Sequence, residues 1–216
     1  MADPILLSIA LLSGAGLLGR TGGKGGQPTP PSDGNWSFPL PSWRTYRPTM
    51  SQEYRPFDVG ATLAHHGNDI MYQRKADGVD QMWPNGFVGS NGNHGTPRWF
   101  MPDNIPVCAA RDGTLWQVGK GGHGIYVVVD HGTPFATFYT HLSSTPFPDL
   151  VHGAGSIKVK RGDKLGIVGF SPSDARRLMH LHFEIWYQGG ADSHVDPWPI
   201  LATAPLPDTK APGLVS

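Results

Sequence analysis

The sequence has no excess of charge of either sign and almost no cysteine. Its 17 Lys and Arg residues balance 17 Asp and Glu residues, so the formal net charge is +0 at pH 7. Proteins drawn to nucleic acid or to an anionic membrane are strongly basic, so this balance argues against a nucleic-acid partner. The only cysteine is Cys108, which excludes an intramolecular disulfide and a cysteine-rich zinc knuckle. A bound metal must therefore be held mainly by the histidines.

The sequence also lacks a hydrophobic run long enough to span a membrane. The apolar stretch Ile5–Leu18 is too short, at about 1.5 Å per residue, to cross a hydrocarbon core of about 30 Å. An acidic residue, Asp3, precedes it where a secretory signal carries positive charge. We expect residues 1–19 to form a packing or assembly helix, with a membrane-touching or export segment and an ordinary buried helix as the alternatives.

Glycine and proline are abundant, with 29 and 21 residues respectively, and this composition argues against a helical bundle. Residues 20–52 are predicted to be a Gly/Pro-rich linker followed by an arm. The prolines of Trp36–Pro56 exclude a regular helix and suggest that this stretch lies over the surface of the folded domain. Residues 202–216 are predicted to form a second arm.

From Val107 onward, short apolar segments alternate with turns that contain glycine or proline. No helical periodicity separates these segments, so they predict an antiparallel β-sheet or sandwich. The predicted strands are Thr114–Val118, Ile125–Val129, Phe135–Leu142, Ile157–Val159, Leu165–Val168 and Leu181–Tyr187.

Three histidine-containing stretches could carry chemistry. His65 and Asp69 lie in HHGND, whose glycine would let the backbone fold so that an imidazole and a carboxylate reach one ion. On a strand, side chains alternate, so His180 and His182 of HLHFE should project from one face. The same alternation predicts that His141 of TFYTHL shares a face with Thr137 and Tyr139.

Together these stretches resemble the lysostaphin-like, or LytM-type, zinc endopeptidases that hydrolyse peptidoglycan. The resemblance runs from Glu53 to Leu201. It rests on six motifs in order: HHGND at 65–69, DHG at 130–132, TFYTHL at 137–142, KRGDKLGIVG at 160–169, HLHFE at 180–184 and DP at 196–197. Six ordered motifs are far more specific than any one of them.

The resemblance implies a zinc endopeptidase domain at residues 53–201, a mainly antiparallel β fold with a groove across the sheet. It implies that His65, Asp69 and His182 are the zinc ligands, with a fourth position left open for water. His141 and His180 would then be the catalytic pair beside that water, and the spacing does not decide which of them is the base. The H-x-G-x-D register favours His65 over its neighbour His66 as the ligand.

The sequence departs from the family pattern at two places. Residues 71–106 form an insertion, which we expect to be a loop near one wall of the groove, and SPSDARRLM at 171–179 replaces the usual approach to HLHFE. Glu184 lies two residues beyond His182 and could orient a ligand, although we expect a structural role. We assign no chemistry to the loop histidines at 94, 131, 152 and 194.

The expected function is zinc-dependent cleavage of a peptide bond in the stem or cross-bridge of bacterial peptidoglycan. The alternative is a structural or assembly subunit that keeps the fold without cutting, with assembly partners bound through the N-terminal segment and the arms. A phage particle must breach the cell wall, so a phage-tail, virion-associated location is expected, with an exported or periplasmic protein as the other possibility.

Overall fold

The computed structural model describes residues 29–58, 62–74, 88–89, 92–132, 134–151, 153, 156–187 and 193–208. Its strands are β1 (Pro48–Gln52), β2 (Asn68–Gln73), β3 (Val88–Gly89), β4 (Gly92–Asn93), β5 (Trp99–Phe100), β6 (Pro106–Cys108), β7 (Gly113–Gly121), β8 (Gly124–Asp130), β9 (Phe135–Ser144), β10 (Lys158–Val159), β11 (Lys164–Phe170), β12 (Met179–Tyr187) and β13 (His194–Val195). One short helix, α2 (Trp198–Leu201), follows. The N-terminal apolar stretch Ile5–Leu18 lies outside the described residues.

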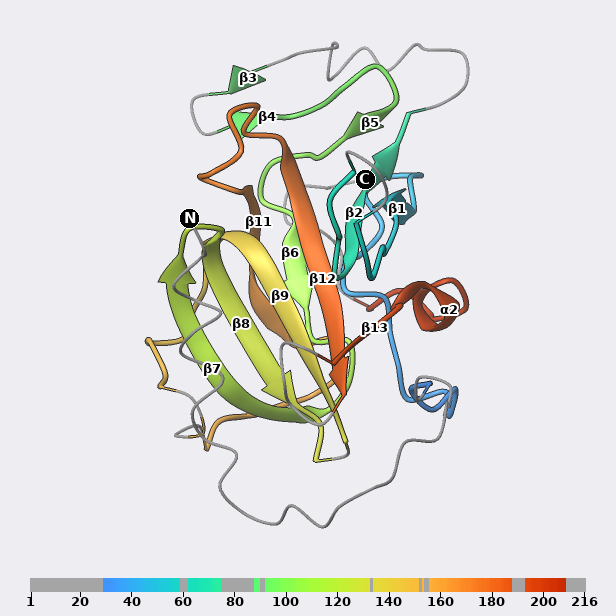
Figure 1. Ribbon diagram of the computed structural model, residues 1–216, viewed down its shortest axis with the longest axis vertical. Coiled ribbons are helices and arrows are strands. Elements are labelled where there is room, and N and C mark those ends of the chain that lie inside the picture. Colours follow the sequence, from blue (N-terminus) through green and yellow to red (C-terminus); the bar gives the residue numbers. More distant parts are fainter. Residues whose placement is uncertain are drawn as a thin grey trace.

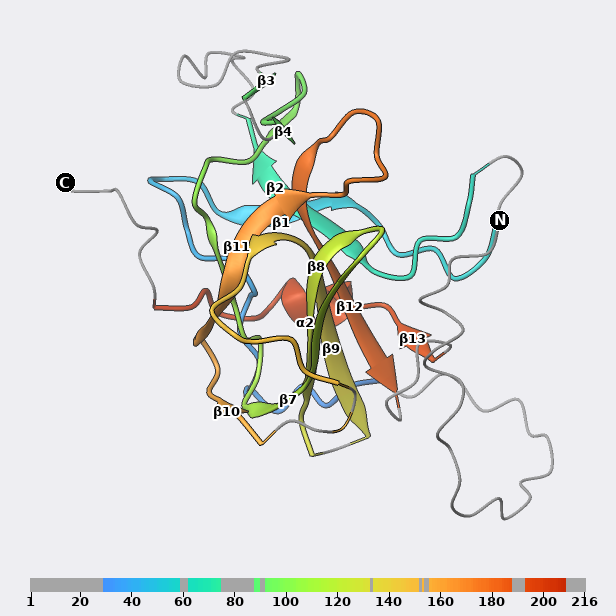
Figure 2. The same ribbon diagram turned by 90° about the vertical axis from the view of Figure 1, so that its left-hand side faces the viewer.

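One curved sheet dominates the described part of the chain. Its main path runs β1-β2-β12-β11-β9-β8-β7-β10; β5, β6 and β13 pair at its sides, and β12 also pairs with β9. Figure 1 shows β7, β8, β9 and β12 side by side, with β2 and β1 beyond β12, and Figure 2 shows β9 still alongside β12 after the view is turned. Every one of these pairings is antiparallel. The predicted mainly antiparallel β fold is confirmed.

The core forms where alternate side chains of these strands meet on one face. Leu181, Phe183 and Ile185 of β12 are each 0% exposed, as alternation predicts, and they pack with side chains of β2, β8, β9 and β11. The helix α2 adds Ile200 and Leu201 to the same core. The opposite face of β12 is thereby left for His180, His182 and Glu184.

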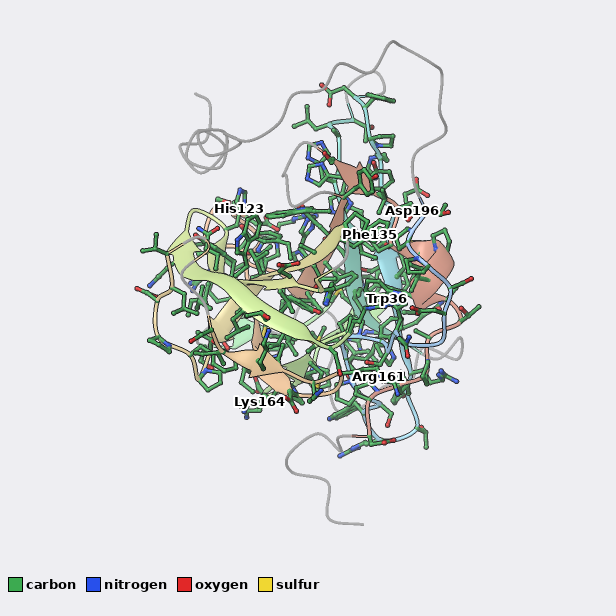
Figure 3. All side chains as sticks on the ribbon, turned by 90° about the horizontal axis from the view of Figure 1, so that it is seen from below. Trp36, His123, Phe135, Arg161, Lys164 and Asp196 are labelled. Atoms are coloured by element: carbon green, nitrogen blue, oxygen red, sulfur yellow. The ribbon has the colours of Figure 1, made fainter. Side chains whose placement is uncertain are left out.

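The N-terminal arm is part of this core, which differs from the predicted surface position. Trp36, Phe38, Leu40 and Trp43 are buried, and Trp36 is labelled within the packed side chains of Figure 3. Burying an aromatic or leucine side chain contributes about 1.5–3 kcal/mol, which is enough to hold an irregular segment in place. The Phe38 N–H also donates to the Pro205 carbonyl at 2.8 Å, so the two arms contact each other.

The folded unit therefore extends beyond residues 53–201 at both ends. The strand β1, which precedes Glu53, pairs along β2, with Pro48 opposite Tyr72. Ala204, which follows Leu201, is buried in the core. Sequence motifs mark only the segments that carry chemistry, so they missed apolar segments that complete the core.

A buried histidine ties the turn before β9 to the core. The His131 Nδ1–H donates to the Asp112 carbonyl at 2.8 Å, and its Nε2 lies 3.0 Å from the Thr137 hydroxyl. The Thr137 and Tyr139 hydroxyls are 3.0 Å apart, and the latter accepts the Ala110 N–H at 2.8 Å. Burial lowers the pKa of His131 to about 4, so its ring is neutral at pH 7.

Among the residues that the structure describes, no helix combines the length and the hydrophobicity required to span a membrane.

Candidate metal centre and active site

Three of the predicted site residues converge because of strand register. In the pairing of β2 with β12, Asp69 lies directly opposite His182. Asp69 Oδ1 is 2.9 Å from His182 Nδ1 and 3.0 Å from His65 Nε2, and the two histidine nitrogens are 3.1 Å apart. These three residues form the group of the described chain whose atoms could hold a metal ion. A turn and two strands, distant in sequence, thus supply one cluster.

The glycine of the HHGND motif has a steric role. A Cβ added at Gly67 would lie 2.3 Å from the Phe183 carbonyl oxygen and 2.8 Å from Glu184 Cγ. Real Cβ atoms do not approach a backbone oxygen so closely, so a side chain here would push the turn away from β12. The missing Cβ allows His65 and Asp69 to reach His182.

Hydrogen bonds at the outer edges of the rings fix which nitrogens face the cluster. The His65 Nδ1–H donates to the Glu53 carbonyl at 2.7 Å, and the His182 Nε2–H donates to Glu184 Oε1 at 2.8 Å. The lone pairs of His65 Nε2 and His182 Nδ1 are then left toward Asp69, so three acceptor atoms face one another.

This donor set fits zinc. Two imidazole nitrogens and a carboxylate oxygen are ordinary zinc ligands, and ligands about 2.0–2.1 Å from a tetrahedral ion lie about 3.3 Å from each other. The observed separations of 2.9–3.1 Å are close to that value. Three acceptors at such distances require a shared cation or proton between them.

The other two predicted histidines lie beside this cluster. The ring centroids of His141 and His180 are 4.6 Å apart, and those of His141 and His182 are 5.7 Å apart. The His141 Nδ1–H donates to the His123 carbonyl and the His180 Nδ1–H to the Leu178 carbonyl, both at 2.8 Å. Each ring therefore keeps Nε2 as its free acceptor.

The predicted face of His141 is wrong. Thr137 and Tyr139 are both 0% exposed on the core side, whereas His141 lines the pocket with Phe138 and Thr140. Its φ of 65° lies in the left-handed region, which interrupts the alternation of the strand. The neighbouring strand accommodates this irregularity at Gly169, where a Cβ would meet the His141 carbonyl oxygen at 2.8 Å.

Comparison with known proteins identifies a family for part of this chain. Residues 92–197 match peptidase family M23, and this stretch contains His141, His180 and His182. This match assigns the chain to that family. His65 and Asp69 lie before the matched stretch. The pairing of β2 with β12 brings them to His182, which lies within it.

A curated relative of this M23 chain is the peptidoglycan DD-endopeptidase ShyA of Vibrio cholerae, which is 31% identical over 99 residues. That match covers 44% of this chain and 21% of ShyA. The chain spans about a fifth of the length of the first curated relatives that it matches.

Two solved structures share the fold. A zinc-containing peptidase of Vibrio cholerae has a TM-score of 0.50 at 22% identity, over 79% of this chain and 41% of that one. A chain of the SpoIIQ–SpoIIIAH pore-forming complex has a TM-score of 0.51 at 19% identity, over 77% of this chain and 90% of that one. At these identities the likeness shows the fold alone.

Charge interactions shift the protonation of the M23 site. Burial disfavours the charged forms of Asp69 and His182, but the contacts between them outweigh this effect. The pKa of Asp69 therefore lies well below its usual range. Hydrogen bonds to Asp69 and Glu184 raise the pKa of His182 to about 10. Burial and the neighbouring His180 and His182 lower the pKa of His141 to about 3, which leaves it neutral.

The M23 site lies in a cavity of about 450 Å³. Its lining residues are Gln52, Ala64, His65, His66, Asp69, His123, Phe138, Thr140, His141, Ser171, Asp174, Arg176, His180, His182 and Glu184. His123 belongs to this lining, whereas Arg161 and Lys164 do not, and Figure 3 shows His123 above both of them in the view. None of the described residues of the insertion at 71–106 is in this lining; instead β5 extends the sheet by pairing with β2.

The structure brings two further residues to the site: Glu184, for which the sequence analysis favoured a structural role, and His194, to which it assigned no chemistry. Glu184 contacts His182 directly, and His194, from β13, lies 3.1 Å from Glu184. The ring of His66 stacks on the ring of His194, with centroids 4.1 Å apart, and His66 is not part of the metal cluster. The strand spacing of HLHFE had indicated that Glu184 could orient a ligand, but no sequence signal pointed to His194.

Proposed function

We propose that the chain is a zinc-dependent endopeptidase that cleaves peptide bonds in the stem or cross-bridge of bacterial peptidoglycan. The observation that carries this proposal is the convergence of His65, Asp69 and His182 next to His141 and His180 in one cavity. Three ligands with an open position, flanked by two imidazoles, are typical of a catalytic metal site and not of a structural one.

The residues of the site would have different roles in the reaction. His65, Asp69 and His182 would hold zinc, which as a Lewis acid polarises a carbonyl and lowers the pKa of water to about 7. His141, neutral because its pKa is lowered to about 3, can hydrogen-bond through Nε2 to a reacting group. His180 presents Nε2 from the strand of His182, 3.6 Å from Asp69 Oδ2. One of the pair would take a proton from water through its Nε2 lone pair. The other, in the form that carries a proton on Nε2, would stabilise negative charge on the substrate.

The choice of peptidoglycan as the substrate rests on similarity. ShyA carries the name of a peptidoglycan endopeptidase and shares 31% of residues over the matched region. The cavity also offers few charges outside the metal cluster, with Asp174, Arg176 and Glu184 as the other charged side chains, and Asp174 is paired with Arg176. Such a site suits the small, uncharged residues of a cross-bridge.

Digestion of purified sacculi tests this function. We expect the zinc-loaded protein to release muropeptides whose masses identify the cleaved bond, a chelator to stop the release, and added zinc to restore it. His182→Ala is the matched inactive control, because it removes a ligand from the face of β12 and leaves the core residues of that strand in place. Undigested sacculi with fully zinc-loaded protein would show that the proposal is wrong.

A non-cleaving assembly subunit is the alternative. The fold neighbour from a pore-forming complex is the observation in its favour. The complete set of ligand and catalytic side chains favours the enzyme, since a scaffold has no need of them. The phage-tail location stays a prediction; detection of a processed periplasmic species without residues 1–20 would contradict it.

A further inference from the structure

Behind the metal cluster lies a buried carboxylate that three N–H groups surround. Glu184 is 8% exposed. Its Oε1 accepts the His182 Nε2–H at 2.8 Å, and its Oε2 accepts the Trp186 Nε1–H and lies 3.1 Å from His194 Nε2. An ionised carboxylate loses its hydration when buried, so each of these donors replaces water that the group has given up.

Sheet pairing places the donors around this carboxylate. Glu184 and Trp186 lie on one face of β12 because they are two residues apart. His194, in β13, pairs directly with Trp186 in the antiparallel register. The position of His194 is thus set by backbone hydrogen bonds, independently of its side chain.

The chemistry of these groups fixes the direction of each hydrogen bond. The indole nitrogen of Trp186 can only donate, and an ionised Glu184 can only accept. The nitrogen of His182 that faces Glu184 must therefore carry a hydrogen. The remaining nitrogen of His182, Nδ1, is then directed to Asp69, 2.9 Å away.

The same network reaches the other side of the metal cluster. His194 is 9% exposed, and its ring stacks on the ring of His66, with an interplanar angle of 26°. His66 directly follows the ligand His65 in the chain. His194 therefore contacts both Glu184, which holds one ligand, and the neighbour of a second ligand.

We infer that Glu184 and His194 are positioning residues for the metal centre, which hold His182 with Nδ1 toward the cation. The inference rests on the proposed function for the identity of the cation, zinc. Groups that hydrogen-bond to the outer nitrogen of a metal-bound histidine fix its tautomer and orientation, and their loss typically weakens metal binding about 10–100-fold. His194 acts one contact further out, by holding the Glu184 carboxylate in place from 3.1 Å.

Zinc affinity, measured by competition with a chelator, tests the inference without any peptidase assay. We expect Glu184→Gln to weaken zinc binding about 10–100-fold, because an amide N–H₂ would face one of the N–H donors. His194→Leu should weaken it about 10-fold, and His194→Gln, which can still donate, should restore most of the affinity. His94→Leu is the matched control: His94 is also buried, hydrogen-bonds the Met101 carbonyl and lies beside Asp103, but does not line the cavity.

An unchanged zinc affinity in folded His194→Leu, or an equal loss in His94→Leu, would overturn the inference for His194. Should the variants fail to fold, the ring ¹⁵N spectra of the zinc-loaded wild type decide the matter. A proton on His182 Nε2 with zinc at Nδ1 is expected; the reverse arrangement would overturn the inference. Zinc affinities in the expected order without digestion of sacculi would refute the proposed function while leaving the positioning role intact.

Discussion

Replacement of Gly67 by alanine tests whether close contact between the first ligand segment and β12 builds the metal centre. The added Cβ would lie 2.3 Å from the Phe183 carbonyl oxygen, whereas non-bonded heavy atoms rest about 3.5 Å apart. About 1 Å of movement is therefore needed. Phe183 lies in a strand that pairs with β2 on one side and β9 on the other, so its backbone is poorly able to yield.

The turn that carries His65 would therefore have to move away from β12. Overpacking of this kind costs about 1–3 kcal/mol, which for a domain of this size lowers Tm by about 2–10 °C. A displacement of about 1 Å between His65 and His182 also separates two ligands of one ion, and a misplacement of that size costs about 100-fold in turnover. We expect Gly67→Ala to lose zinc under mild chelation while keeping most of its β structure.

Thermal unfolding, zinc content after dialysis and muropeptide release from sacculi measure these effects. Gly122→Ala is the matched control, because a Cβ at Gly122 would have no atom within 4 Å. That control should match the wild type in all three assays. If Gly67→Ala also matched the wild type in Tm, zinc content and activity, the steric reasoning about this glycine would be refuted.

Three further predictions concern histidine side chains and the metal. His182→Ala should lose both zinc and activity, while His141→Ala and His180→Ala should keep stoichiometric zinc and lose turnover; zinc loss in all three, by metal analysis, would show that the division of roles is wrong. The pKa of His131 is about 4 in the folded protein, below its usual 6.5, so between these two pH values the unfolded chain binds the extra proton. The free energy of unfolding should therefore fall by about 3 kcal/mol as the pH is lowered from 6.5 to 4. Urea titrations should show that this part of the pH dependence disappears in His131→Gln. Chelation should lower the Tm of the wild type, because a ligand at 100 times its Kd stabilises by about 2.7 kcal/mol, and a His182→Ala protein whose Tm responded equally to the chelator would contradict zinc binding at this site.

The sequence was sufficient where one strand determines the outcome. The alternation in HLHFE placed His180 and His182 on one face and Leu181, Phe183 and Ile185 in the core, and the structure agrees. The rule holds because successive side chains of a strand point to opposite faces regardless of what packs on them. The antiparallel architecture followed in the same way from short apolar segments separated by turns.

The same rule failed at His141, where a single residue with positive φ turns the side chain from the core face to the pocket. The left-handed conformation carries no sequence signal at a histidine. It is maintained by close packing of β11 against β9, where Gly169 leaves room for the His141 carbonyl. Neighbouring strands therefore decided the direction of this catalytic candidate.

What the sequence by itself determined is the set of side chains and their local faces, since residue type and the two-residue period of a strand are properties of short segments. Only the tertiary structure decided which of them meet. The pairing of Asp69 with His182, the contact of His194 with Glu184 and the burial of Trp36 all join segments far apart in the chain. Such contacts depend on the register between strands and on the shape of the core, which no local pattern contains.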